Sequence, residues 1–374
     1  MRILVVGGGP AGLSFACLMA ETDSPHEITL IERNAAHVRP GFGITLRNDA
    51  ISFLGLDKCL SYQRLEGRTF WRRGEVIVDL PNPPEAHLVT LSRAELITTL
   101  ANRCSRNGVR LRYENDIAQL RQSDLNDFDL VVGADGAYST VRRIYDHAFA
   151  PVVEYARNRY GWFGAAILFS KLTIMLNDDH RAMLAWAYRY TESLSTVIVE
   201  CSESAFEAYG INDLSPQQTM AKVGDIFVSE LKGGSVFCGN VAPWPRFPMV
   251  SCAKLHYLNV VLIGDAAHTT HFSQGFGTMF AFDDSLALCS ALAAAKDVST
   301  ALEAYEAAQR PKISQFQETS FGSMRWSERL IDAAEQGDER KVRELIATRW
   351  PKNKVLPGPL GSNGSDSPSR ASRQ

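Results

Sequence analysis

The sequence lacks the features that define several large classes of protein. No apolar run approaches the roughly 18 residues that a membrane-spanning helix needs. The seven cysteines are scattered, and no two of them stand at the spacing of a metal site, so no metal is expected. Positive charge is not in excess, since the net charge is −3. This argues against a nucleic-acid partner and against binding to an anionic membrane.

These absences leave a globular protein of the cytoplasm as the expectation. An odd number of dispersed cysteines is typical of reduced thiols in a cytoplasmic protein. Met1 leads directly into an apolar segment that predicts a strand, so a cleaved signal peptide is not expected. The length of 374 residues predicts about two to three domains with a large buried core. The sequence does not indicate an oligomeric state.

The first part of the chain carries a dinucleotide-binding motif. An apolar strand, Ile3–Val6, runs into Gly7-x-Gly9-x-x-Gly12, and Glu32 stands twenty residues after Gly12 at the end of a second strand. Gly7 permits a tight turn, Gly9 lets the backbone approach a pyrophosphate, and Gly12 lets the helix pack closely on the strand. The alternative is a glycine-rich turn that only packs.

Residues next to these positions complete the predicted cofactor site. Pro10 suits the first turn of a helix, where a missing N–H costs nothing, and Ala11 follows it. Glu32 would accept hydrogen bonds from the hydroxyls of a ribose, which favours FAD or NAD over a cofactor with a 2′-phosphate. Arg33 directly follows this acid and is included in the predicted cofactor site.

The order of elements predicts an α/β protein with a discontinuous, Rossmann-like nucleotide-binding domain over residues 1–70, 93–150 and 252–330. Within it, residues 51–66 predict a helix, and residues 93–107 predict another. An apolar strand at 258–263 is expected to return to the first sheet, followed by a long helix through Ala294.

The rest of the chain has a different composition. Residues 71–92 and 151–251 predict a substrate domain with a mainly antiparallel β-sheet, because aromatic and β-branched residues are frequent there. C-terminal helices are expected, the last of them within 331–350. Residues 351–374 are dense in Ser, Gly, Pro and Asn, and this composition predicts a disordered tail.

Two further glycine-acid motifs follow apolar strands. They are Gly133-Ala134-Asp135-Gly136 and Gly264-Asp265-Ala266-Ala267-His268. Together with the first motif, this arrangement resembles the group A flavin monooxygenases, the family of p-hydroxybenzoate hydroxylase. The resemblance implies a GR2-type FAD-binding domain in which Asp135, Gly264 and Asp265 contact the cofactor. The alternative for each Asp is a helix cap after a strand.

The resemblance extends to two other segments. Arg93, in Ser92-Arg93-Ala94-Glu95-Leu96, looks like the family arginine that neutralises the FAD phosphates, and a guanidinium can hydrogen-bond a pyrophosphate bidentately. The alternative is a solvated helix start. The segment His271-Phe272-Ser273-Gln274-Gly275-Phe276-Gly277-Thr278 is similar to the branch of salicylyl-CoA hydroxylase and of the violacein-pathway hydroxylase. By this resemblance Gly275, Gly277 and Thr278 lie at the flavin ring. Trp186 stands where that branch is expected to have a histidine, so substrate identity is not transferred.

The implied activity is hydroxylation of a small aromatic substrate of indole, anthranilate or salicylate type. NADPH or NADH would reduce FAD as a transient co-substrate, and O2 would then give a flavin C4a-hydroperoxide that transfers one oxygen atom. The alternatives are a flavin-dependent oxidase or halogenase and a non-catalytic FAD-binding protein. The resemblance leaves open whether the substrate is free or a CoA thioester.

Candidate substrate residues come from the middle sheet and the third motif. Tyr160, Trp162, Tyr188 and Phe272 are expected to line the substrate pocket, because aromatic side chains stack well on aromatic ligands. His271 is the candidate catalytic base, since a neutral imidazole accepts a proton near neutral pH. Core packing is the alternative for the aromatic residues. A buried, hydrogen-bonded structural role is the alternative for His271.

Overall fold

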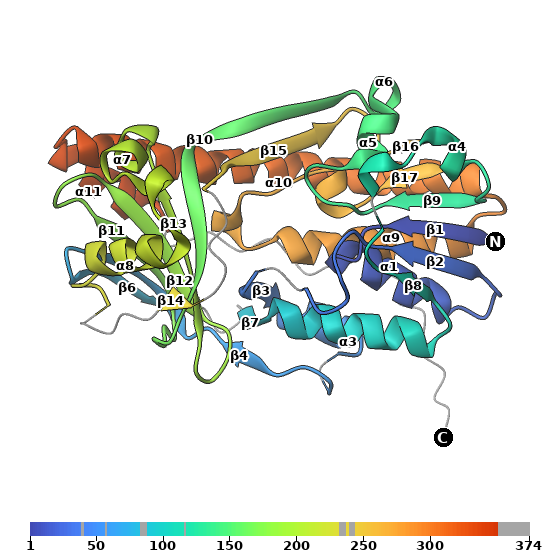
Figure 1. Ribbon diagram of the computed structural model, residues 1–374, viewed down its shortest axis with the longest axis horizontal. Helices are drawn as coiled ribbons and strands as arrows, with labels where there is room; N and C mark the ends of the chain where they lie inside the picture. The colour runs from blue at the N-terminus through green and yellow to red at the C-terminus, as the bar shows by residue number, and fades with distance from the viewer. Residues whose placement is uncertain are drawn as a thin grey trace.

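The computed structural model describes residues 1–38, 41–56, 58–82, 88–115, 117–231, 237–238 and 244–350. Three β-sheets and a set of covering helices make up this part of the chain (Figure 1). The predicted disordered tail, residues 351–374, lies outside the described residues. No helix of the described ranges is both long and apolar enough to cross a membrane.

The first sheet is the predicted nucleotide-binding sheet, with the strand order β16-β17-β9-β1-β2-β8. Its strands are β1 (Arg2–Val6), β2 (Glu27–Ile31), β8 (Arg110–Arg112), β9 (Leu130–Gly133), β16 (His256–Tyr257) and β17 (Val260–Leu262). All pairs are parallel except β16 with β17. The expected return of the chain to this sheet is confirmed, because β17 pairs with β9 although more than a hundred residues separate them.

Helices pack beside this sheet (Figure 1). The larger ones are α1 (Pro10–Ala20), α3 (Arg93–Arg106) and α9 (Gly277–Ala294), and the shorter ones are α4 (Gln122–Leu125), α5 (Thr140–Ile144) and α6 (Asp146–Phe149). α1 packs on α9 through a hydrogen bond of 2.8 Å between the buried hydroxyls of Ser14 and Ser285. The predicted helices at 93–107 and up to Ala294 are therefore confirmed.

The second sheet is large and mainly antiparallel, as predicted for the middle of the chain. Its order is β14-β10-β13-β12-β11-β5-β6, with β15 paired to the other half of β10. The strands are β5 (Gly67–Arg72), β6 (Glu75–Pro81), β10 (Pro151–Ala165), β11 (Leu172–Asn177), β12 (Met183–Arg189), β13 (Ser195–Cys201), β14 (Phe237–Cys238) and β15 (Arg246–Cys252). Only the pair β5–β11 is parallel. The helices α7 (Glu203–Ala208) and α8 (Pro216–Ile226) lie beside this sheet (Figure 1).

The region between the first two sheets differs from the sequence prediction in three details, and it includes a small third sheet. It contains β3 (Gly43–Arg47), β4 (Tyr62–Arg64) and β7 (Leu88–Ser92), in the order β3-β7-β4. The helix predicted over 51–66 is wrong for most of its length, since α2 spans Asn48–Phe53 and β4 follows. The predicted boundary at residue 70 falls inside β5, and β7, predicted with the substrate sheet, pairs instead with β3. Local composition missed these partners because they are distant in sequence.

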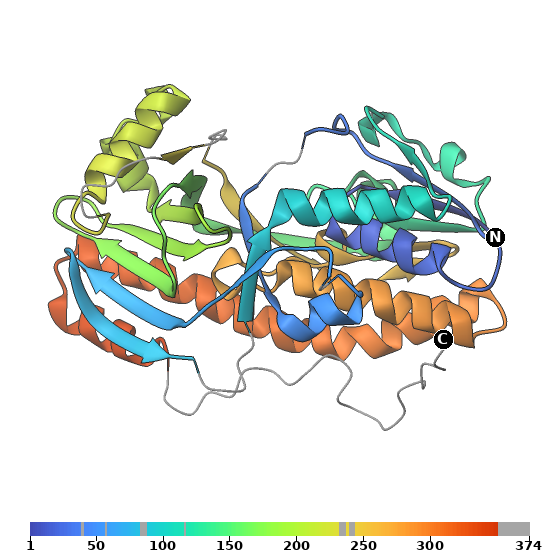
Figure 2. The ribbon, with the colours of Figure 1, turned by 90° about the horizontal axis from the view of Figure 1, so that it is seen from below.

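A single long helix runs beside the parallel sheet and the large sheet. α10 (Val298–Glu335) has 38 residues and extends along the whole length of the molecule (Figure 2). It continues through the boundary predicted at residue 330, and the helix predicted within 331–350 is α11 (Glu339–Thr348). Asp297 caps the start of α10 by accepting a hydrogen bond from the backbone N–H of Thr300. α10 therefore connects the parallel sheet to the large sheet.

A buried carboxyl group joins α10 to the large sheet. Glu200 of β13 is only 2% exposed and accepts hydrogen bonds from Trp186 Nε1 (2.8 Å), Asn158 Nδ2 (3.2 Å) and Ser327 Oγ (3.0 Å). Burial raises the pKa of Glu200 to about 7, although these donors oppose the shift. The network links strands β10, β12 and β13 to α10 at a buried point.

This shift predicts a measurable dependence of stability on pH. The folded pKa is raised above the unfolded value of 4.5, so between these two pH values the unfolded state releases its proton first. Stability from this group is then present at low pH and falls as the pH rises to 7, by on the order of 3 kcal/mol. The side chain of Glu200→Gln does not titrate. The melting temperature of this variant, relative to that of the wild type at the same pH, should therefore rise between pH 5 and pH 8. Parallel melting curves for the two proteins across this range would contradict the assignment.

Candidate functional site

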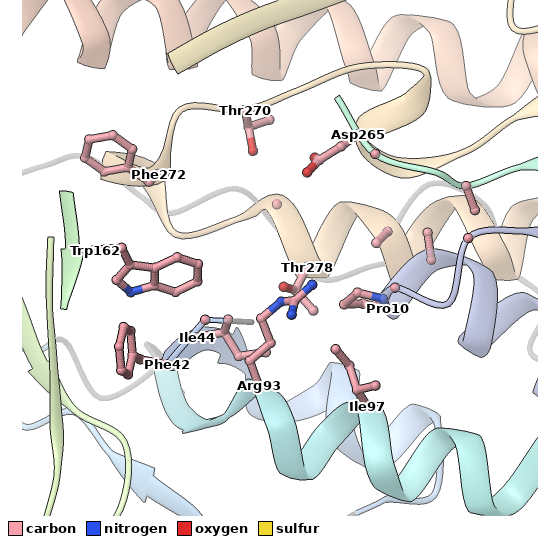
Figure 3. A pocket seen from close by; sticks show the side chains of 18 of the residues that line it. Pro10, Phe42, Ile44, Arg93, Ile97, Trp162, Asp265, Thr270, Phe272 and Thr278 are labelled. Carbon is pink, nitrogen blue, oxygen red and sulfur yellow. The ribbon is translucent and has the colours of Figure 1, made fainter. Parts of the chain in front are cut away.

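A cavity of about 560 Å³ lies where the parallel sheet, the small sheet and the large sheet meet. It is lined by the turn after β1, the end of β2, the segment after β9, the start of α3, strands β10 and β12, and the segment 265–278 (Figure 3). These elements come from distant parts of the chain. The cavity brings together all three glycine-acid motifs of the sequence, Arg93 and the predicted aromatic residues.

One end of the cavity is formed by the turn between β1 and α1. Gly7, Gly9, Pro10 and Ala11 all line it. Gly7 has φ +110°, and a Cβ there would overlap the carbonyl group of Ala134, so only glycine fits. A Cβ at Gly9 would meet no protein atom within 4 Å, which leaves the backbone open toward a ligand. Because α1 begins at Pro10, its free N–H groups and positive dipole end lie at this turn.

Gly12 has a different position from the other motif glycines. It does not line the cavity, and a Cβ there would overlap the carbonyl oxygen of Gly7. Its function is the close packing of α1 on the turn, which is the role expected for the third glycine. Gly264 is also outside the lining. Its φ is +59°, and its N–H donates to the buried carboxylate of Asp284 at 2.7 Å.

Glu32 is held rigidly at the rim of the cavity. One carboxylate oxygen accepts a hydrogen bond from Gly8 N at 2.7 Å, and the other accepts from the backbone N and side-chain Nδ2 of Asn34 at 2.9 and 2.7 Å. Arg33 beside it also lines the cavity and is exposed. Sequence analysis missed Gly8 and Asn34. Asn34 orients the acid, and its position two residues after Glu32 is the only signal that could have identified it.

The two motif acids differ in their environments. Asp135 lines the cavity, but its carboxylate accepts hydrogen bonds from Ser139 Oγ (2.5 Å) and the backbone N–H of Thr140 (2.6 Å). It therefore caps the first turn of α5, which is the alternative that the sequence left open. Burial raises the pKa of Asp135, and these hydrogen bonds oppose the shift.

Asp265 faces the cavity directly. Its side chain is exposed there, and it accepts no hydrogen bond from any described residue. The surrounding protein raises the pKa of this carboxyl group by desolvation, while His268 and the Arg93 guanidinium oppose the shift. Arg93 is the first residue of α3 and lines the cavity, where its side chain extends toward Thr278 and Pro10 (Figure 3). A carboxylate open to the cavity and a nearby cation suit a ligand with hydroxyl and phosphate groups.

The segment after Asp265 is fixed against the small sheet. The hydroxyl of Thr45 in β3 donates to the carbonyl of Gly275 at 2.8 Å, and Gly275 has φ +70°. A side chain at Gly275 would overlap this hydroxyl. Gly275, Gly277 and Thr278 all line the cavity, as predicted, and α9 begins at Gly277. The start of a long helix thus borders the middle of the cavity.

Aromatic side chains form the other end of the cavity. The predicted residues Tyr160, Trp162, Tyr188 and Phe272 all line it. The ring of Phe272 is 5.1 Å from that of Tyr160, and Trp162 meets Phe42 edge to face at 6.1 Å. Figure 3 shows Phe42, Trp162 and Phe272 together on one side. The lining also contains residues outside the predicted substrate and cofactor residues, namely Phe42, Ile44, Thr45, Ile97, Ile198, Pro245, Phe247 and Thr270.

His271 does not reach the cavity. Its ring is 1% exposed, its Nδ1 lies 2.7 Å from Ser273 Oγ, and it packs on Phe272 at 4.0 Å. Burial, together with the nearby Arg349 charge, lowers the pKa of His271 to about 3. The prediction that His271 touches the substrate is therefore not supported by its position. In this turn, Phe272 faces the cavity, and His271 belongs to a hydrogen-bond network with Ser273 and Ser323.

The donor set of the cavity fits FAD. No cluster of three or more His, Cys, Asp or Glu side chains that could hold a metal occurs in the described ranges. The glycine turn, the open carboxylate of Asp265 and the cation of Arg93 suit a dinucleotide. The hydroxyl of Thr270, which lines the cavity, is buried without a hydrogen-bond partner, and this is consistent with a bound polar ligand.

Comparison with known proteins agrees with this geometry. The salicyloyl-CoA 5-hydroxylase of a Streptomyces species is 31% identical over 88% of this chain, and the match spans 65% of that protein's own length. The protodeoxyviolaceinate monooxygenase of Chromobacterium violaceum is 28% identical, with 93% of this chain and 95% of that protein covered. Both names belong to the branch that the sequence resembles, so that prediction is confirmed.

A solved structure supports the fold, and a family model supports the family. The structure of 2-methyl-3-hydroxypyridine-5-carboxylic acid oxygenase matches with a TM-score of 0.73 and 18% identity, covering 92% of this chain and 95% of that one, and this likeness confirms the fold class. The family model described as FAD binding domain matches residues 1–320. The chain therefore belongs to the FAD binding domain family.

Proposed function

We propose that this protein is an FAD-dependent monooxygenase that hydroxylates an aromatic substrate with NAD(P)H and O2. The observation that carries this proposal is a single cavity with a dinucleotide-type end and an aromatic end. The names of the relatives support it, since salicyloyl-CoA 5-hydroxylase is named for hydroxylation of an aromatic acyl group. Bound FAD, reduced by NAD(P)H, would supply the oxygen-activating chemistry.

The protein's own residues would bind and position the reactants. Free N–H groups at the turn around Gly9 would receive the pyrophosphate, Glu32 a ribose, and Arg93 a phosphate charge. Asp265, which is open to the cavity, would accept hydrogen bonds from hydroxyl groups of the cofactor. The start of α9 at Gly277 would stabilise negative charge in the middle of the cavity through its dipole.

The two ends of the cavity suggest that the sheets have different functions. We propose that the parallel sheet and its helices hold the cofactor and that the large sheet forms the wall of the substrate site. Trp162 and Tyr188, which lie on β10 and β12, support this division. Aromatic walls also exclude water, which would otherwise compete with the substrate for the activated oxygen.

We also propose that the protein works in the cytoplasm. Six cysteines whose side chains the structure describes, Cys17, Cys59, Cys104, Cys201, Cys252 and Cys289, are unpaired, and four of them are buried. This supports a protein that works in the reducing cytoplasm.

The proposed reaction is tested by following NAD(P)H oxidation and product mass together. The FAD-loaded protein would be offered phenols, anthranilates, aryl-CoA thioesters and indoles. We expect at least one compound both to accelerate NAD(P)H oxidation and to gain the mass of one oxygen atom. A halogenated or dehydrogenated product would instead indicate a halogenase or an oxidase. No stimulation by any compound would contradict the proposed hydroxylase.

The cofactor site predicts a selective effect of a methyl group at Gly9. Gly9→Ala should fold normally, because the added Cβ meets no protein atom within 4 Å. It should nevertheless weaken FAD binding at least about tenfold, because the methyl group would stand where a pyrophosphate approaches the backbone. Gly322→Ala on α10 is the matched control, since its Cβ also meets nothing within 4 Å. Equal flavin content in both variants would place the cofactor elsewhere.

The position of His271 predicts that it does not act as the base for the substrate. His271→Asn retains a group that can hydrogen-bond Ser273, so we expect kcat to change less than about threefold and the pH profile to keep its shape. The physical reason is that the ring is buried outside the cavity and its low pKa keeps it neutral. Loss of an inflection from the pH profile of this variant would show that His271 does exchange a proton during turnover.

A further inference from the structure

The C-terminal helix α11 is followed by an arginine whose guanidinium packs on two tryptophan rings. Arg349 comes directly after Thr348, the last residue of α11. Its guanidinium carbon lies 4.4 Å from the centroid of the Trp326 ring and 5.0 Å from that of the Trp186 ring. The two rings are 6.0 Å apart and meet edge to face. Because an indole ring attracts a cation, the pair forms a binding site for one guanidinium group.

Both tryptophan rings are fixed by hydrogen bonds of their own. Trp186 is 2% exposed and does not line the cavity, and its Nε1 donates to Glu200 at 2.8 Å. Trp326 Nε1 donates to the carbonyl of Leu345 in α11 at 2.9 Å. Trp186, which stands where a histidine was expected from the resemblance, therefore offers its ring to Arg349 and not to a substrate.

The same guanidinium is bonded to the turn 271–275, which borders the cavity. Arg349 Nη2 donates to the carbonyl of Ser273 in this turn at 3.3 Å, and Nη1 donates to Ser323 Oγ of α10 at 2.9 Å. Phe272, the residue before Ser273, lines the aromatic end of the cavity. One side chain thus contacts the large sheet, α10 and a turn of the site.

Hydrogen bonds continue from Arg349 to His271. Ser323 Oγ lies 2.7 Å from Ser273 Oγ, which in turn lies 2.7 Å from His271 Nδ1. Because a guanidinium only donates, donation can run from Arg349 through both serines to an unprotonated Nδ1. The low pKa of His271, caused by burial and by the Arg349 charge, agrees with this direction. His271 is then the last acceptor of a network that fixes the turn.

The turn 271–275 has little internal support. Within it, Gln274 N donates to the carbonyl of His271 at 3.0 Å, and Gly275 N donates to the carbonyl of Phe272 at 2.9 Å. Thr45 holds the end of the turn, and Arg349 holds its middle. A shift of this segment would move the ring of Phe272, and with it the wall of the aromatic end.

We propose that Arg349 is a positioning residue of the site, which fixes the turn 271–275 and thereby the ring of Phe272. Trp186 and Trp326 hold the guanidinium in the required place. Arg349 lies beyond residues 1–320, the part of the chain that the family model matches. The inference rests on the proposed function only for its effect on turnover, because its effect on the turn concerns the protein alone.

Hydrogen exchange of backbone amides tests the turn without turnover, in protein with and without added FAD. In Arg349→Ala, the amides of Gln274 and Gly275 should exchange at least about tenfold faster than in the wild type, because local opening is no longer opposed by the guanidinium. Peptides from β1 and β9 should exchange as in the wild type, which separates local loosening from a loss of global stability. Arg343→Ala is the matched control, since Arg343 is exposed on α11. Wild-type exchange in the turn of Arg349→Ala would overturn the inference.

Arg349→Lys provides a second variant that keeps the charge, in case Arg349→Ala does not fold. Lysine lacks the planar group that stacks on indole rings and donates two hydrogen bonds in a fixed geometry. The turn of this variant should therefore exchange faster than that of the wild type. Wild-type exchange in Arg349→Lys would overturn the role of the two rings, because charge alone would then hold the turn.

The effect on the reaction is tested with any compound that the wild type hydroxylates. When the substrate ring is poorly placed, NAD(P)H and O2 give NAD(P)⁺ and hydrogen peroxide instead of a hydroxylated product. In Arg349→Ala we expect the fraction of NAD(P)H that ends in hydrogen peroxide to rise at least about twofold, because a looser wall orients the substrate less well. An unchanged fraction, despite faster exchange in the turn, would overturn the link from the turn to the substrate.

The two readouts separate this inference from the proposed function. If no compound is hydroxylated, the monooxygenase proposal fails, and hydrogen exchange still decides whether Arg349 fixes the turn. If a compound is hydroxylated and the turn of Arg349→Ala exchanges as in the wild type, the monooxygenase proposal stands and the role of Arg349 is wrong.

Discussion

The close approach of three backbone segments at Gly7 is the constraint on which the site depends. The turn after β1 touches Ala134 after β9 and the first turn of α1 at Gly12, and no side chain fits between them. This contact places the carboxyl ends of parallel strands beside the free N–H groups of α1. The acids Glu32 and Asp265 then face the same cavity from β2 and from the segment after β17.

The aromatic end depends on a second set of contacts between the sheets. The hydroxyl of Tyr188 on β12 donates a hydrogen bond to the carbonyl of Gly43 on β3. The hydroxyl of Thr45, also on β3, donates a hydrogen bond to the carbonyl of Gly275. The small sheet therefore connects the substrate wall to the segment before α9. α10 is joined to the large sheet through the buried network around Glu200. A cavity fixed from several sides is well suited to hold a planar ring against a cofactor.

For several residues, membership of a motif did not predict the role of the side chain in the site. Asp135 follows a strand in a glycine-rich motif, and it does line the cavity, but its carboxylate is used to cap α5. His271 and Phe272 are neighbours in one motif, yet only Phe272 faces the cavity. Asn34 belongs to no motif and still orients Glu32. A motif thus predicts that a segment reaches the site more reliably than it predicts what each side chain does there.

The sequence by itself determined the nucleotide-binding turn, the return of the last strand to the first sheet and the antiparallel character of the middle region. These features follow from local spacing and from apolar or β-branched runs, which are properties of contiguous residues. Only the tertiary structure decided that β7 pairs with β3, that Phe42 and Phe247 join the cavity and that His271 turns away from it. Such outcomes depend on contacts between segments far apart in the chain, and no local pattern encodes which face of a turn meets them.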